Sequence, residues 1–86
     1  MESEKSKILI AEDEPDLLSI MDGLLSPHFD VVLAKDGFEA KKLIESHNFL
    51  FLILDSHLPD LSGLSLVGII ANQQLPPPMS SILMTT

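Results

Sequence analysis

The chain has 86 residues, of which 45% are hydrophobic and 21% charged, so it has the composition of a globular protein and the length of one domain. Thirteen acidic residues against five basic ones give a formal net charge of −8, which excludes nucleic acid and anionic membranes as direct partners, since both need a basic surface. The chain contains no cysteine, which excludes disulfides and thiolate zinc sites.

The N-terminal part of the chain predicts a buried strand followed by a helix. Lys7–Ala11 is a short apolar run bounded by charge, and an acidic turn follows it. Pro15 suits the first turn of a helix, where its missing N–H costs nothing, and Ser26-Pro27 ends that helix. Five apolar residues recur at helical spacing and are expected to form its single buried face: Leu17, Ile20, Met21, Leu24 and Leu25.

Two further strands enclose a second helix. Val31–Ala34 is rich in β-branched residues and predicts a strand. Asp36 caps a helix expected from about Gly37 to Ser46. Three of its residues are expected on the buried side: Phe38, Leu43 and Ile44. Phe49–Leu54 is apolar without alternation, which is typical of a strand buried on both faces in a parallel sheet.

The C-terminal part predicts a loop over 56–63, a helix over about 64–71, an extended proline-containing loop over 73–80 and a last strand over 81–86. Strands that alternate with helices imply a parallel sheet with right-handed crossovers. In such sheets ligands bind beyond the carboxyl ends of the strands, at the point where the strand order reverses.

Three acidic residues follow strands at this edge. Glu12 and Asp13 come directly after the first predicted strand, and Asp55 comes after the third. Two like charges about 4 Å apart repel by roughly 4 kcal/mol at an effective dielectric constant near 20, so a proton or a cation must relieve such a cluster. Hard oxygen ligands open to solvent suit Mg²⁺. For any one of the three, a solvated turn residue is the alternative interpretation.

Three segments carry a family resemblance: KILIAEDEP at 7–15, AKDGFEA at 34–40 and LILDSHLPDLSG at 52–63. In this order and spacing they resemble the receiver domain of two-component response regulators, truncated after its fourth strand. The resemblance implies an α/β fold with a flavodoxin-like parallel sheet and helices on both faces, of which the first four strands and three helices are present. Residues 1–86 are then expected to form a single, incomplete receiver-like domain.

The resemblance also implies the residues of a site. Asp55 would be the phosphoacceptor and a ligand of Mg²⁺. Asp13 would ligate the ion directly, Glu12 would help through water, and the backbone carbonyl of His57 would be a further ligand. Glu12 stands where the family more commonly has aspartate, which is a shorter side chain with the same charge.

A switch and a partner follow from the same resemblance. A hydroxyl at the end of the last strand, placed at Thr86 with Thr85 as the competing choice, would sense the phosphoryl group. The implied function is a phosphorelay signalling switch rather than an enzyme: it accepts a phosphoryl group from a histidine kinase or phosphotransfer protein and alters partner binding. The family's lysine at the end of a fifth strand has no counterpart among the five lysines of this chain.

The sequence leaves two other functions to consider. One is a receiver-derived interaction module that acts without phosphorylation, because the first helix alone is not expected to cover four strands and an uncovered sheet face favours self-association. The other is a phosphohydrolase of the haloacid dehalogenase type, which is disfavoured because such enzymes need an aspartate where this chain has His57.

The expected location is the cytoplasm. The polar start of the chain does not resemble a signal peptide. The longest apolar run, 49–54, is far shorter than the roughly 20 residues that a membrane-spanning helix needs.

Overall fold

The computed structural model describes residues 5–72 and 81–85. In this part of the chain four strands alternate with three helices, as the sequence predicted. The elements are β1 (Lys7–Ala11), α1 (Pro15–Leu25), β2 (Asp30–Ala34), α2 (Gly37–Ser46), β3 (Phe51–Asp55), α3 (Gly63–Ala71) and β4 (Ser81–Thr85). The segment predicted as an extended loop over 73–80 lies outside the described residues.

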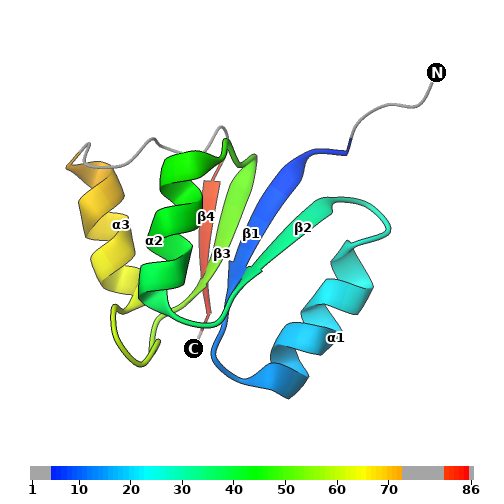
Figure 1. The fold of residues 1–86 in the computed structure, drawn as a ribbon, viewed down its shortest axis with the longest axis horizontal. Helices are drawn as coiled ribbons and strands as arrows, with labels where there is room; N and C mark the ends of the chain where they lie inside the picture. Colours follow the sequence, from blue (N-terminus) through cyan, green and yellow to red (C-terminus); the bar gives the residue numbers. More distant parts are fainter. Residues whose placement is uncertain (1–4, 73–80, 86) are drawn as a thin grey trace.

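The four strands form one parallel sheet in the order β2-β1-β3-β4. Figure 1 shows α1 on one side of this sheet and α2 and α3 on the other, which confirms the predicted flavodoxin-like arrangement. The chain moves from β1 to β2 in one direction and returns past β1 to reach β3. The strand order therefore reverses between β1 and β3, and their carboxyl ends lie side by side, with Ala11 paired with Leu54.

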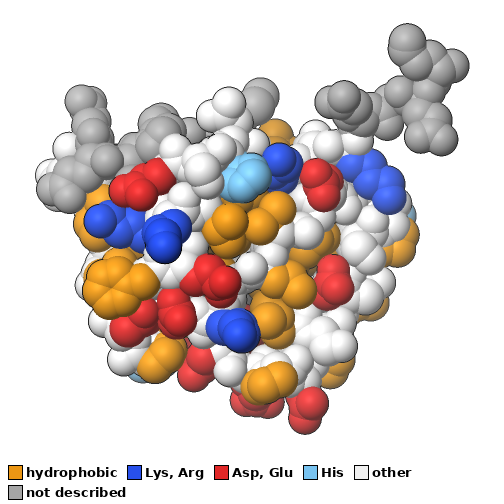
Figure 2. Space-filling view, viewed as in Figure 1, with side chains coloured by type: hydrophobic (Ala, Val, Ile, Leu, Met, Phe, Trp, Pro, Cys, Tyr) orange, Lys and Arg blue, Asp and Glu red, His pale blue; other side chains and the backbone are white. Residues whose placement is uncertain are grey.

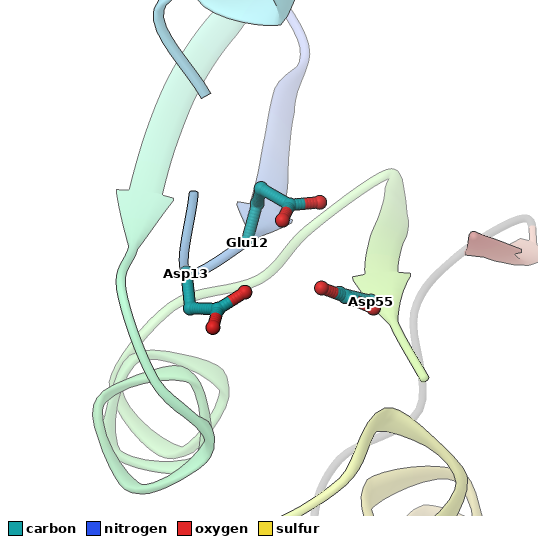
Figure 3. Close-up of side chains that lie close together, drawn as sticks. All are labelled: Glu12, Asp13 and Asp55. Atoms are coloured by element: carbon teal, nitrogen blue, oxygen red, sulfur yellow. The ribbon is translucent and has the colours of Figure 1, made fainter. Parts of the chain in front are cut away.

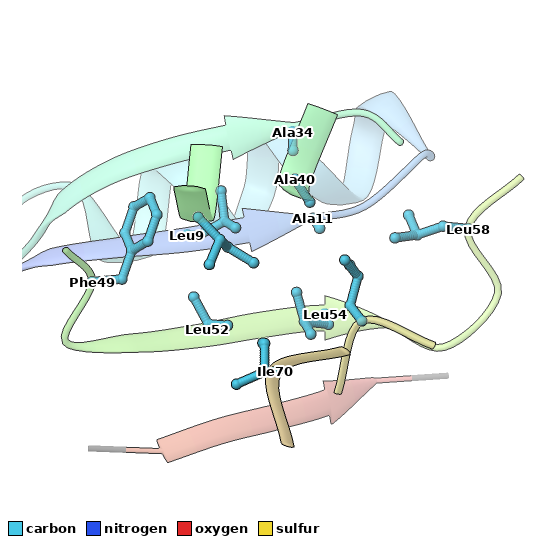
Figure 4. Close-up of a cluster of buried hydrophobic side chains, with 11 residues drawn as sticks. Leu9, Ala11, Ala34, Ala40, Phe49, Leu52, Leu54, Leu58 and Ile70 are labelled. Atoms are coloured by element: carbon cyan, nitrogen blue, oxygen red, sulfur yellow. The ribbon is translucent and has the colours of Figure 1, made fainter. Parts of the chain in front are cut away.

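The larger part of the core lies between the sheet and helices α2 and α3 (Figure 4). Its buried side chains are Leu9, Ala11, Ala34, Ala40, Ile44, Phe49, Leu52, Leu54, Leu58, Leu66 and Ile70. A smaller cluster under α1 contains Ile10, Leu18 and Ile53. Because β1 and β3 bury side chains on both faces, each contains an uninterrupted apolar run, as residues 49–54 predicted for β3.

Two predicted helix faces are wrong in part. In α1 the predicted residues Met21 and Leu25 pack toward the sheet, together with Leu18, which was not predicted. The other three predicted residues are exposed: Leu17 by 37%, Ile20 by 59% and Leu24 by 69%. The apolar residues of α1 form two adjoining stripes at helical spacing, and a helix lying on a sheet buries only one of them. In α2, Phe38 is 58% exposed, whereas Leu43 and Ile44 pack into the core as predicted.

The face of β3 beneath α1 is also less bare than expected. Ile53 is only 6% exposed and belongs to the cluster that contains Leu18. Phe51 is partly buried, and its ring meets that of Phe29 edge to face with centroids 5.5 Å apart. The connection between α1 and β2 therefore covers part of this face of β3 with an apolar side chain, which the sequence had not predicted.

Charged side chains of both signs are interspersed on the face of the molecule that Figure 2 shows, so the acidic excess is spread over this face rather than gathered into one field. Among residues 5–72 and 81–85, no helix has the length and hydrophobicity needed to span a membrane.

Candidate functional site

The structure brings together the three carboxylates at the carboxyl ends of β1 and β3. Carboxylate oxygens of Glu12, Asp13 and Asp55 all lie within 4.8 Å of one another. Figure 3 shows Glu12 and Asp13 following β1, Asp55 at the end of β3, and the carboxylates turned toward a common space. This convergence follows from the parallel pairing of β1 with β3, which sets their carboxyl ends at the same edge of the sheet.

The cluster is partly withdrawn from water. Glu12 is 5% exposed and Asp55 is 7% exposed, whereas Asp13 is exposed. Burial raises the pKa of Glu12 above its ordinary value, and the hydrogen bond and negative charge of Asp55 and the charge of Asp13 raise it further. The backbone N–H of Glu14, which donates to Glu12 Oε2 at 3.3 Å, acts in the opposite direction and does not outweigh these causes.

The donor set fits a hard divalent cation. Three carboxylates supply oxygen ligands at one point, and the exposure of Asp13 leaves that point accessible to water. Mg²⁺ prefers oxygen ligands and keeps several of its waters, so one or two direct carboxylates are sufficient to bind it. A cation would also remove the repulsion that raises the pKa of Glu12.

Backbone contacts fix the acidic turn between β1 and α1. The N–H of Glu12 donates to the carbonyl oxygen of Ala34 at 3.0 Å, which extends the pairing of β1 with β2 by one residue. Glu14 is the N-cap residue of α1, and Pro15 is its first residue. The two carboxylates of the turn are therefore held between a strand end and a helix start.

The Asp55 carboxylate is oriented by the loop that follows it. The backbone N–H of His57 donates to Asp55 Oδ1 at 2.9 Å. The imidazole of His57 is exposed, and its Nδ1 lies 3.0 Å from Ser56 Oγ. His57 thus acts on Asp55 through its main chain in this structure, while the carbonyl role implied by the family resemblance stays a prediction.

The predicted switch hydroxyl, Thr86, lies outside the described residues. The neighbouring residue Thr85 is the last residue of β4, and its Cα is paired with that of Asp55 in the sheet. The backbone register therefore places the end of β4 beside the phosphoacceptor candidate, at the edge of the sheet where Glu12 and Asp13 lie.

A family model described as response regulator receiver domain matches residues 8–86. The chain belongs to this family. The resemblance inferred from the three motifs is thereby confirmed, and the protein contains a signalling domain of two-component systems rather than a classical enzyme.

A curated relative agrees with this assignment. The chain is 35% identical over 81 residues to the alkaline phosphatase synthesis transcriptional regulatory protein PhoP of Bacillus subtilis. The alignment covers 93% of this chain and 32% of PhoP, so the chain spans about a third of the length of that relative.

Two solved structures share the fold and contain ligands. A response regulator from Burkholderia pseudomallei, with a phosphorylated aspartic acid, a calcium ion and citrate, is 29% identical, with a TM-score of 0.77 over 92% of this chain and 45% of its own. TrrA from Thermotoga maritima, in complex with Mg²⁺-BeF, is 31% identical, with a TM-score of 0.73 over 80% of this chain and 61% of its own.

A glycine lets the β3–α3 loop lie against the start of α2. A Cβ added at Gly37 would lie 2.5 Å from Leu61 Cβ and 2.8 Å from its carbonyl carbon, which is closer than real contacts allow. The glycine is required here because of this close approach, since any side chain would push the loop that follows Asp55 away from the helix.

Replacing Gly37 with alanine is therefore expected to lower the free energy of unfolding by about 1–3 kcal/mol, the usual cost of overpacking a tight contact. The measurement is urea denaturation of the variant beside the wild-type chain. Gly23→Ala is the matched control, because nothing lies within 4 Å of a Cβ there. That change in the interior of α1 should stabilise the protein by about 0.5–1 kcal/mol. Equal effects at the two glycines would contradict the steric explanation.

Proposed function

We propose that this domain accepts a phosphoryl group on Asp55 from a phosphohistidine of a histidine kinase or a phosphotransfer protein, in the presence of Mg²⁺, and then alters its binding to partners. The observation that carries the proposal is the convergence of Glu12, Asp13 and Asp55 within 4.8 Å at the switch point of a receiver-domain sheet. In this proposal residues 1–86 act as one domain in the cytoplasm.

The transfer step needs a nucleophile and an electrostatic environment for the phosphoryl oxygens. An oxygen of Asp55 forms a bond to phosphorus while the phosphorus–nitrogen bond of the donor breaks, which leaves an acyl phosphate on Asp55 and a neutral imidazole on the donor once it gains a proton. The His57 N–H holds the attacking carboxylate in place through Oδ1. A bound Mg²⁺, held directly by Asp13 and Asp55, by Glu12 through water and by the His57 carbonyl, would supply positive charge at the crowded oxygens.

The conformational response is proposed to begin at the end of β4. A hydroxyl there would donate to a phosphoryl oxygen and move inward, which would bias a loop between two arrangements. The family resemblance suggested Thr86, and the strand register supports Thr85, because the Cα of Thr85 is paired with that of Asp55.

Binding of Mg²⁺ and of beryllofluoride, which mimics a phosphoryl group, tests the proposal directly. Isothermal titration calorimetry of the wild-type chain should show one Mg²⁺ site, and the fluorine NMR spectrum should show bound beryllofluoride only when Mg²⁺ is present. Asp30→Asn is the matched control for Asp55→Asn: each substitution removes one negative charge, but Asp30 is exposed and lies at the opposite end of the sheet. Asp30→Asn should therefore change the Mg²⁺ dissociation constant less than about twofold. A chain that binds neither ligand does not have the proposed function.

A second candidate function is favoured by the apolar row on α1. Leu17, Ile20 and Leu24 lie at helical spacing and are 37–69% exposed, which is typical of a surface that another molecule covers. In this alternative the domain associates with itself or with a partner without phosphorylation. Light scattering tests the self-association in this alternative, because a monomer at high concentration, with or without Mg²⁺, would exclude it.

A further inference from the structure

Asp60 connects the loop after β3 to the start of α2. Its Oδ1 accepts a hydrogen bond from the Gly37 N–H at 2.7 Å, and its Oδ2 accepts one from the Phe38 N–H at 3.1 Å. Oδ1 also accepts from the N–H of Leu61 within its own loop at 2.7 Å. A single carboxylate therefore joins two segments that are more than 20 residues apart in the sequence.

The two hydrogen bonds between Asp60 and α2 satisfy backbone N–H groups of the helix that its N-cap residue does not bind. Asp36, the N-cap residue of α2, accepts from the N–H of Glu39 at 2.8 Å, and the Glu39 side chain accepts in return from the N–H of Lys35 at 2.8 Å. Gly37 and Phe38 supply the first two free amides of the helix, and Asp60 binds both. A carboxylate is the favoured partner at this position because the N-terminus of a helix carries partial positive charge.

The contact holds an ionised carboxylate. Desolvation acts to raise the pKa of Asp60, but the N–H donors of Gly37, Phe38 and Leu61 outweigh it and lower the pKa below its ordinary value. The backbone of Leu61 also packs directly against Gly37 at this point. The loop is thus fixed to α2 both by charge-assisted hydrogen bonds and by a close steric contact.

Only a short stretch separates this anchor from the phosphoacceptor candidate. At one end of the loop the His57 N–H donates to Asp55 Oδ1, and three residues later Asp60 is bound to α2. Between them Leu58 is 7% exposed and belongs to the core cluster beneath α2 and α3. A loop fixed at two points this close together has little freedom to change where the His57 main chain lies.

We propose that Asp60 is a positioning residue for the site: by holding the β3–α3 loop, residues 56–62, on the first turn of α2, it places the His57 main chain against Asp55 and thereby sets the affinity for the divalent cation. The placement of His57 is a property of the metal-free protein. Only the consequence for cation affinity rests on the proposed function.

Amide hydrogen exchange of the metal-free chain tests the placement. Asp60→Ala should speed exchange of the His57 amide by about tenfold or more, because the loop that holds this amide against Asp55 is released. Asp36→Ala is the matched control, since it removes a carboxylate cap from the same helix end without touching the loop. It should destabilise α2 but change exchange at His57 less than about twofold. Unchanged exchange in Asp60→Ala, or equal acceleration in both variants, overturns the inference.

Asp60→Asn covers the case in which the alanine variant does not fold. The amide oxygen still accepts one bond from the start of α2, so exchange at His57 should lie between that of the wild type and that of a variant without the carboxylate. Exchange in Asp60→Asn identical to that of the wild type, together with an unchanged Mg²⁺ affinity, would also contradict the proposed role.

Calorimetric titration with Mg²⁺ tests the consequence. Loss of a group that orients a ligand commonly weakens metal binding 10–100-fold, so Asp60→Ala should weaken binding by about tenfold and Asp36→Ala by less than twofold. If the wild-type chain itself binds no Mg²⁺, the proposed function fails, and the exchange experiment still decides whether Asp60 positions His57. If the wild type binds and Asp60→Ala binds equally well, the link to cation affinity is wrong.

Discussion

Replacing Asp55 with asparagine is expected to abolish phosphoryl transfer while leaving the fold intact. The amide has no anionic oxygen to attack phosphorus, so phosphate incorporation from a histidine kinase should fall below detection. The amide oxygen still accepts the hydrogen bond from the His57 N–H, which is 2.9 Å long in the wild type. Removing one charge from a buried cluster should also make the metal-free variant at least as stable as the wild type. Radiolabelled phosphotransfer and urea denaturation measure the two effects.

The control for this variant is again Asp30→Asn, which carries the same substitution at the other end of the sheet and should be phosphorylated at the wild-type rate. Phosphate incorporated into Asp55→Asn at a rate similar to the wild type would show that another residue is the acceptor. A large loss of stability in Asp55→Asn would mean that the carboxylate is a structural group, contrary to the interpretation of the cluster.

Replacing Glu12 with glutamine is expected to change stability and metal binding in opposite directions. At 4.8 Å and an effective dielectric constant near 20, each ionised pair in the cluster repels by about 3.5 kcal/mol, and Glu12 is also buried. Glutamine keeps an oxygen for the Glu14 N–H but has no charge. The metal-free variant should therefore be about 1–3 kcal/mol more stable than the wild type, while its Mg²⁺ affinity should fall by about tenfold.

The pH dependence of stability distinguishes this electrostatic effect of Glu12→Gln from an effect of the substitution on packing. Because burial and the neighbouring charges raise the pKa of Glu12 in the folded protein, its contribution favours folding below the ordinary glutamate pKa and is lost as pH rises through the higher folded value. The stability of metal-free Glu12→Gln should lack this decrease. In the wild type, Mg²⁺ at about 100 times its dissociation constant should add roughly 2.7 kcal/mol near neutral pH. Parallel pH profiles of the two proteins would contradict the electrostatic explanation.

Several features were predictable from the sequence because they depend on short-range patterns. The continuous apolar run before Asp55 identified a central parallel strand, and Pro15 and Asp36 marked the starts of the first two helices. The convergence of Glu12, Asp13 and Asp55 was predictable in the same way, because parallel strands joined by helices must end at one edge of the sheet. The family resemblance implied roles for these residues, which a topological rule alone does not do.

Other features could be established only from the tertiary structure. Two stripes of α1 have similar spacing and hydrophobicity, and only the packing of the helix on the sheet decides that Leu18 is buried and Leu24 is exposed. No local pattern pairs Asp60 with the first amides of α2, because that contact requires two loops from different strands to meet at the same edge.

The sequence by itself thus determined the order of the elements, the parallel sheet and the edge at which the carboxylates meet, since each of these follows from periodicity and chain direction. The tertiary structure alone decided which side chains are desolvated and which loops touch. The burial of Glu12, and with it the rise in its pKa, belongs to this second group. Desolvation and long-range contacts depend on the packing of segments that are distant in the chain, and no window of neighbouring residues contains that information.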